Sequence, residues 1–498
     1  MLTNTRRTFS QTIALTALTF CAGSGLVLSK ETDDPNNGES PAEWPTYRST
    51  VGRTGATTDS GPASPVTTTW TMDLKGGMMT TEPVVADGTL YLAVTTDNSP
   101  SQSRGYVAAY DSETGDQQWI RDDVPGVNTP TVAVGTLYVA TNVSPESDSE
   151  DGGLIALDRQ TGETTWQRDD HVAWADPILV DDRVYTVKEH SPEDPGTSVQ
   201  ALDASTGDTV WQTADVQGDV CYADGTVFTT DGTALNAADG TVLWSVAADG
   251  MMGQHVIQAV DNGLVYGVIQ EGDSNQNVVQ ARSPDDGSVQ WSFPTGTSGF
   301  WAGRLTVGAG HVFFRTTMNG THAIRALDAK TGEGAWSYDA DTELTSDLTV
   351  ADGILYAGGR TDSDPELGDA VIVALDAAAG EREWDYIFGR WELDEYGPAA
   401  NAPIIANGRV YTATYPKGST LDYQYTEYGD LYVLGCSDSD DHVQVEDSKS
   451  ADETDAANHG SAQDDTESQS KEENGSITDS PINQDHITNS ENNTTTDC

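Results

Sequence analysis

Basic residues are scarce in this 498-residue chain, which carries 24 Lys and Arg against 80 Asp and Glu, for a formal net charge of −56. Nucleic-acid binding needs a basic surface, so we expect no nucleic-acid partner. Such self-repulsion destabilises a compact state at low salt, whereas molar salt shortens the screening length to about 3 Å. Acids are spread along the chain, as at Asp122-Asp123 and Asp181-Asp182. The composition therefore predicts a protein adapted to high salt.

Cysteine is also rare, with four residues in all: Cys21, Cys221, Cys436 and Cys498. Cys21 lies in an apolar N-terminal stretch and Cys498 is the last residue, so only Cys221 and Cys436 fall in the repeated part of the chain described below. A disulfide needs Cα atoms within about 7 Å. These two belong to units that we expect on opposite sides of a ring, so we predict no disulfide between them.

The common catalytic signatures are missing. The chain has no His-Glu-x-x-His, no phosphate-binding Gly loop, no Gly-x-Ser-x-Gly elbow and no Cys-x-x-Cys-His haem attachment site. We therefore assign no catalytic residue and no metal site from the sequence.

A short phrase, a turn with Gly or Asp followed by an apolar pair ending in an aromatic ring, recurs eight times. The copies end at Tyr91, Tyr138, Tyr185, Phe228, Tyr266, Phe313, Tyr356 and Tyr411. A period of roughly 40 to 50 residues indicates an array of supersecondary units, none of which buries its apolar face alone.

A second phrase, Ala-x-Asp followed by a turn at Gly and then Trp, lies between these copies. Asp, or its replacements Asn236 and Ser283, can accept hydrogen bonds from following N–H groups, and Gly supplies the φ > 0 corner. The expected docking tryptophans, including one before the first complete phrase, are Trp70, Trp119, Trp166, Trp211, Trp244, Trp291, Trp336 and Trp384. Their regular places predict a structural role in packing one unit on the next.

The two phrases together predict an all-β fold, an eight-bladed propeller of four-stranded antiparallel blades. The segment around Trp70 resembles an outer strand with no unit before it, whereas Gly429 to Gly435 resembles a third strand with no fourth after it. Pairing the two would complete the last blade with the N-terminal strand and remove free sheet edges.

The repeats resemble those of the PQQ-like family of eight-bladed propellers with quinoprotein-type tryptophan-docking repeats, which includes the bacterial outer-membrane assembly lipoprotein of the BamB type. Trp44-Pro45-Thr46-Tyr47-Arg48 and Gly52-Arg53-Thr54-Gly55 also resemble the lead-in of exported relatives. The resemblance covers residues 44–436. Together with the acidic composition, which resembles that of halophilic archaeal proteins, it implies a haloarchaeal, exported, BamB-like propeller.

The chain ends differ from the repeats. Thr5-Arg6-Arg7-Thr8-Phe9 and the apolar stretch that follows match a twin-arginine export signal, so we assign residues 1–30 to a signal and residues 31–43 to a polar linker. Cys21 stands at a possible lipoprotein cleavage site; an ordinary cleaved signal and an uncleaved anchor are the alternatives. Residues 437–498 are predicted to be a disordered acidic tail. We expect an extracellular or cell-surface protein, tethered to the membrane through Cys21 if that residue is lipidated.

If a ligand binds, the predicted place is the mouth of the central channel, where loops after the docking tryptophans carry additional aromatic and polar residues. The candidates are Trp174, Trp301, Trp391, His255, Glu392 and Tyr396. The alternative is that they pack under the loops or fill the channel.

Two function classes remain. The first is a monomeric, non-catalytic scaffold that binds a protein, glycan or small ligand at the channel mouth and carries no cofactor. The alternative, implied by the resemblance, is an oxidoreductase with a quinone such as PQQ in the central channel. The family's adjacent cysteine pair is missing here.

Overall fold

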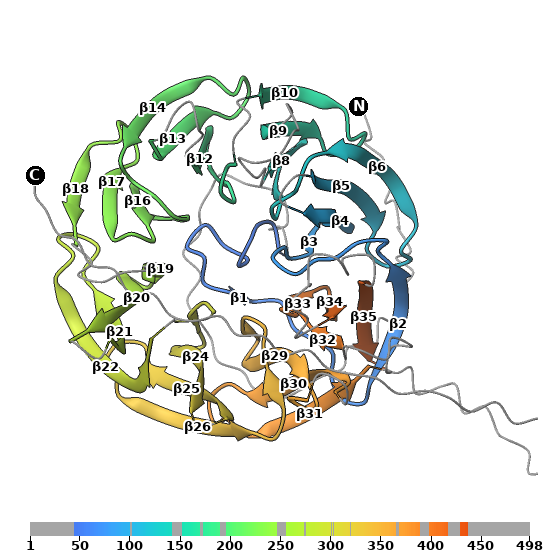
Figure 1. Cartoon of the computed structure of the whole chain (residues 1–498), viewed down its shortest axis with the longest axis vertical. Helices are drawn as coiled ribbons and strands as arrows, with labels where there is room; N and C mark the ends of the chain where they lie inside the picture. Colours follow the sequence, from blue (N-terminus) through green and yellow to red (C-terminus); the bar gives the residue numbers. More distant parts are fainter. Residues whose placement is uncertain are drawn as a thin grey trace, which may run out of the picture. The chain divides into compact units, whose positions relative to one another are not determined.

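All regular structure described in the computed structural model is β-strand, arranged as a ring of sheets (Figure 1). The structure describes residues 44–99, 102–141, 152–169, 173–189, 196–246, 255–272, 275–299, 301, 303–318, 320–364, 368–388, 398–416 and 429–436. Within these residues no helix is long and apolar enough to cross a membrane.

The ring has eight sheets, as predicted, and each sheet is one blade. Blade 1 contains β3 (Val84–Ala86), β4 (Thr89–Ser99), β5 (Gln102–Asp111) and β6 (Gln117–Val124). Blade 2 contains β7 (Thr131–Ala133), β8 (Thr136–Ala140), β9 (Gly153–Asp158) and β10 (Thr164–Asp169). Blade 3 contains β11 (Ile178–Val180), β12 (Arg183–Lys188), β13 (Ser198–Asp203) and β14 (Thr209–Ala214). Blade 4 contains β15 (Val220–Ala223), β16 (Thr226–Thr229), β17 (Thr233–Asn236) and β18 (Val242–Ser245).

The other four blades repeat the antiparallel order. Blade 5 contains β19 (His255–Asp261), β20 (Leu264–Glu271), β21 (Gln276–Arg282) and β22 (Val289–Ser298). Blade 6 contains β23 (Thr306–Gly308), β24 (His311–Met318), β25 (Thr321–Asp328) and β26 (Gly334–Ala340). Blade 7 contains β27 (Glu343–Leu344), β28 (Thr349–Ala351), β29 (Ile354–Arg360), β30 (Ala370–Asp376) and β31 (Arg382–Ile387). Blade 8 contains β32 (Pro398–Ala400), β33 (Ile404–Ala406), β34 (Arg409–Pro416) and β35 (Asp430–Cys436).

Blade 8 is completed by β2 (Val66–Asp73), an N-terminal strand that pairs antiparallel with β35. Trp70 lies opposite Val433 and Met72 opposite Leu431. The predicted closure by the two ends of the folded region is therefore confirmed, and the outer position of blade 8 is filled like those of the other blades.

The repeat phrase forms the turn that we expected between the third and fourth strands of a blade. In blade 2, Asp158 Oδ1 accepts hydrogen bonds from the backbone N–H groups of Gln160 (3.0 Å) and Thr161 (2.9 Å). Gly162 follows at φ +72°, the left-handed conformation that favours glycine.

Among the described residues, seven of the eight docking tryptophans, all except Trp384, pack on the turn glycine of the next blade. A Cβ on Gly162 would lie 2.7 Å from Cε3 of Trp119 in blade 1, so only glycine fits there. The Trp119 indole N–H also donates to the carbonyl oxygen of Arg159 (3.0 Å). The corresponding glycines of the following blades that face a tryptophan are Gly207, Gly240, Gly287, Gly332 and Gly380. The repeat thus joins neighbouring blades at the outer rim.

Cys221 is buried in blade 4 and Cys436 is exposed at the end of β35 in blade 8. Both are free thiols in the part of the chain that the structure describes.

Candidate functional site

The centre of the ring contains the lead-in segment, which we define as residues 44–61. It includes β1 (Ala56–Thr57), which pairs in parallel with β28 and lies in the middle of the ring in Figure 1. Backbone carbonyl oxygens of the lead-in accept hydrogen bonds from N–H groups in the middle of six inner strands. The donors are Val85, Val132, Tyr222, Val260, Val307 and Val350, at 2.8 to 3.1 Å. The chain itself therefore fills the channel at the middle of the inner strands.

Two buried arginines of the lead-in extend these contacts. Arg48, 1% exposed, donates through Nη1 to the carbonyl oxygen of Leu348 (2.8 Å) and through Nη2 to that of Leu305 (3.2 Å). Arg53, 4% exposed, donates to the carbonyl oxygens of Asp176 (2.8 Å) and Val220 (3.2 Å). These acceptors lie at the entries to blades 7, 6, 3 and 4, so two side chains connect four blades.

Carboxyl groups at the loop ends of the inner strands share this buried region. Glu82 Oε2 accepts hydrogen bonds from the Arg48 backbone N–H (2.9 Å) and the Trp44 indole N–H (3.2 Å), yet burial raises the pKa of Glu82. Burial also raises the pKa of Asp176 to about 6, although nearby Arg53 opposes the shift. Burial acts in the same direction on Asp347, but Arg48 and Arg315 outweigh it and hold its pKa below the ordinary value.

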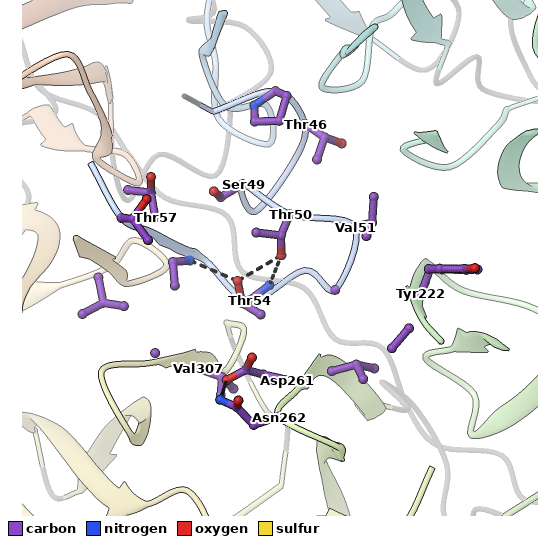
Figure 2. A pocket seen from close by; sticks show the side chains of 18 of the residues that line it. Thr46, Ser49, Thr50, Val51, Thr54, Thr57, Tyr222, Asp261, Asn262 and Val307 are labelled. Carbon is purple, nitrogen blue, oxygen red and sulfur yellow. Dashed lines mark hydrogen bonds between the residues drawn. The ribbon is translucent and has the colours of Figure 1, made fainter. Parts of the chain in front are cut away.

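A hollow of about 1020 Å³ opens on the side of the lead-in opposite these carboxyl groups, among the turns that follow the inner strands. Figure 2 shows threonines of the lead-in on one side of this turn-face hollow and Asp261 with Asn262 across from them. Tyr222, Asp224 and Asp352 also line it, and none of its described lining residues is Lys, Arg or His. The wall therefore offers hydroxyl, amide and carboxylate groups for hydrogen bonding.

The lining groups are held by contacts of their own. Thr50 and Thr54 hydroxyls lie 3.0 Å apart within hydrogen-bonding distance, and the Ser60 hydroxyl donates to Asp352 Oδ2 (2.8 Å). Burial raises the pKa of Asp261. The hollow is thus a pre-formed polar surface.

The structure places three of the predicted residues, Trp174, Trp301 and His255, outside the lining of this hollow. Trp174 (0% exposed) and Trp301 (6% exposed) are buried: Trp174 packs between blades 2 and 3, and the Trp301 ring lies 5.9 Å from that of Phe314. His255 is half-buried at the start of β19, and burial lowers its pKa. Trp391, Glu392 and Tyr396 lie outside the described residues. The binding role of these six residues stays a prediction.

Sequence reasoning missed the turn-face hollow and the position of the lead-in. A signal was present: residues 44–61 contain Arg, Thr and Gly but match neither repeat phrase. A segment that matches neither phrase is not expected to form part of a blade, which is the signal that could have set it apart.

The fit of a quinone cofactor with an accompanying metal ion can be tested on the described residues. They contain no group of three or more His, Cys, Asp or Glu side chains placed to hold a metal ion. The two lead-in arginines already donate to backbone carbonyl oxygens. The described donor set does not match the group, and we derive no redox step from it.

Fold and repeat define this chain as an eight-bladed propeller built from tryptophan-docking units. The family model described as outer membrane protein assembly factor BamB matches residues 65–192, 195–297 and 274–389. The chain therefore belongs to this family of PQQ-like repeat proteins.

Known proteins match this chain in part of their sequence or in fold. The chain is 32% identical over 147 residues to the serine/threonine-protein kinase AfsK of Streptomyces coelicolor, a match over 28% of this chain and 17% of the kinase. The chain thus matches about a sixth of that relative's length. Among solved structures, the quinohemoprotein alcohol dehydrogenase of Comamonas testosteroni is 14% identical, with a TM-score of 0.55 and coverage of 80% of this chain and 81% of that one. A europium-containing methanol dehydrogenase is 13% identical, with a TM-score of 0.55 and coverage of 80% and 98%. At these identities the structural likeness shows the fold alone.

Proposed function

We propose that this protein is a non-catalytic scaffold, exported to the surface of a halophilic archaeal cell, that binds a hydrophilic protein segment or glycan in the turn-face hollow. One observation carries the proposal: the lead-in fills the channel at mid-strand and leaves on the turn face an open hollow walled by hydroxyl, amide and carboxylate groups. Concave sites with a few fixed polar groups are typical of ligand recognition.

The character of the wall supports a neutral or cationic ligand. Asp224, Asp261 and Asp352 contribute carboxyl groups, and no described lining residue is Lys, Arg or His. An anionic ligand would meet like charge, whereas hydroxyl-rich or amine-bearing groups would find acceptors. The family's description as an outer-membrane assembly factor supports a binding role at the cell envelope, without naming a partner for this chain.

The test is binding to arrays of glycans and of acidic, neutral and basic peptides in molar KCl. The double variant Asp224→Lys/Asp261→Lys reverses the charge of the hollow and should weaken binding of neutral and basic ligands at least about tenfold. The matched control, Asp116→Lys/Asp285→Lys, changes two exposed carboxylates in turns at the outer rim. Equal binding by the two double variants would count against the hollow as the site.

The family resemblance also motivates the alternative of a quinone-dependent oxidoreductase, since two solved structures of similar fold are dehydrogenases. Native mass spectrometry of protein purified in high salt separates the two functions. A stoichiometric bound quinone would favour the enzyme, and protein at the mass of the processed chain alone would favour the scaffold.

A further inference from the structure

A small cavity lies on the side of the lead-in opposite the turn-face hollow, among Tyr47, Arg48, Arg53, Asp219, Gln258 and Arg304. Its volume is about 10 Å³, close to the space that one water-sized species occupies. Arg48 is 1% exposed and Gln258 is 3% exposed, so the species inside would be shielded from bulk solvent.

Two of the side chains that line the cavity carry an unpartnered donor. The Oε1 atom of Gln258 accepts a hydrogen bond from the Leu305 N–H (2.7 Å), which fixes the orientation of the amide and leaves Nε2 as the free end. Both Nη atoms of Arg48 bond to oxygen atoms of blades 6 and 7, but its Nε has no partner. A buried donor without an acceptor costs roughly 1–3 kcal/mol, so an acceptor is expected in the cavity that both side chains line.

The charges of the wall define that acceptor. Outside the lining, Asp176 interacts electrostatically with Arg53, and Glu82 and Asp347 interact with Arg48. Among the described lining residues, the guanidinium groups of Arg48, Arg53 and Arg304 stand against one carboxylate, that of Asp219. This carboxylate is already paired with Arg304. Burial raises the pKa of Tyr47 to about 12, so its phenol is neutral and protonated at neutral pH. A water molecule here would have to direct its own two protons towards a positively charged wall, whereas an anion only accepts.

We propose that this cavity binds a single halide-sized anion, chloride in salt solution, between Arg48 Nε and Gln258 Nε2. The anion would accept hydrogen bonds from both free donors where the lead-in meets blades 4 to 6. It would thereby stabilise the closed ring, independently of any ligand in the turn-face hollow.

The test measures thermal unfolding at constant ionic strength and constant cation, with chloride replaced by gluconate, which is too large for the cavity. Wild-type protein should lose about 2–4 °C in its midpoint on this exchange, because a ligand that binds only the folded state stabilises it. Gln258→Glu keeps the acceptor for Leu305 but replaces the free donor by an acceptor, so the difference between the two salts should disappear.

Gln200→Glu is the matched control, because Gln200 is also 3% exposed but its Nε2 already donates to Ser198 Oγ (3.3 Å). It should keep the chloride dependence of the wild type. If Gln258→Glu does not fold, Gln258→Met, which removes the donor without adding charge, should show the same loss. Crystals in bromide should give an anomalous peak between Gln258 and Arg48. An ordered water at that position, or equal midpoints for wild type in both salts, would overturn the proposal.

Discussion

The outer rim of this ring repeats one contact, whereas its centre makes each contact only once. At the rim, the indole N–H of Trp119 donates to the next blade, and the same bond recurs at Trp166, Trp211, Trp244, Trp291 and Trp336. At the centre, one segment bonds to six inner strands through different residues. A lost rim contact therefore weakens one junction, while a lost central contact weakens several blades together.

The largest effect is expected from Arg48→Met at the centre. It removes the donor to Leu305 and Leu348 and leaves the Glu82 carboxyl group buried without the guanidinium charge that opposes its raised pKa. Breaking a buried charged network typically costs about 3–5 kcal/mol, and we expect a loss of this size in the free energy of unfolding, measured with urea in molar salt. Arg48→Lys, which restores the charge but not the paired donors, should fall in between. A loss below about 1 kcal/mol for Arg48→Met would contradict the role of Arg48 in connecting blades at the centre.

The corresponding change at the rim is Trp166→Ala, which should lower the free energy of unfolding by about 3 kcal/mol. This is the lower end of the range for large core deletions, because Trp166 is only partly buried. The change removes the bond from the indole N–H to the Ala204 carbonyl oxygen (2.9 Å) and the packing on Gly207. Hydrogen exchange should accelerate in blades 2 and 3 alone. Acceleration around the whole ring would show that rim and centre respond in the same way.

A smaller effect separates rim geometry from backbone conformation. Gly207 and Gly88 have nearly the same φ, +74° and +72°, but a Cβ on Gly207 would lie 2.6 Å from Cε3 of Trp166, whereas one on Gly88 would meet nothing within 4 Å. Gly88→Ala should cost about 1 kcal/mol for the left-handed conformation, and Gly207→Ala about 1–2 kcal/mol more for the clash. Equal losses in urea denaturation would mean that the docking contact adds nothing.

The rim is also the part that could be predicted from the sequence. Its information is local and repeated: Asp158, Gly162 and Trp166 lie within one short phrase, and the same spacing recurs along the chain. The closure by β2 could also be predicted, because Trp70 precedes the first complete unit and the last unit lacks its fourth strand.

The centre could not be predicted in the same way. The lead-in occurs once, and its carbonyl groups pair with strands up to about 300 residues away, as with Gly55 and Val350. Nothing in a single sequence fixes such distant, non-periodic pairing. Aromatic rings often mark recognition surfaces, which is why the sequence favours Trp174 and Trp301 as site residues; the structure buries both, as in the alternative that they pack under loops. The hollow is lined instead by threonines and turn residues, such as Thr57 and Asn262, which are ordinary in any acidic β protein.

The smallest expected effect is a difference in pH dependence between centre and rim. Burial raises the pKa of Asp176 to about 6, whereas the ordinary pKa of an aspartate is near 3.9. Between these two values the folded state binds more protons than the unfolded state. The free energy of unfolding should therefore fall as the pH rises from about 4 to 6. Backbone N–H groups of the rim turn instead lower the pKa of Asp158. Its contribution to stability is therefore complete above about pH 4 and is lost below that pH. Asp176→Asn should therefore flatten the decline of the unfolding free energy between pH 4 and 6 by about 1 kcal/mol, allowing for partial solvent screening. Asp158→Asn should leave that window unchanged and alter only the acid limb. Parallel curves for Asp176→Asn and wild type between pH 4 and 6 would show that the central carboxyl group titrates no differently from those at the rim.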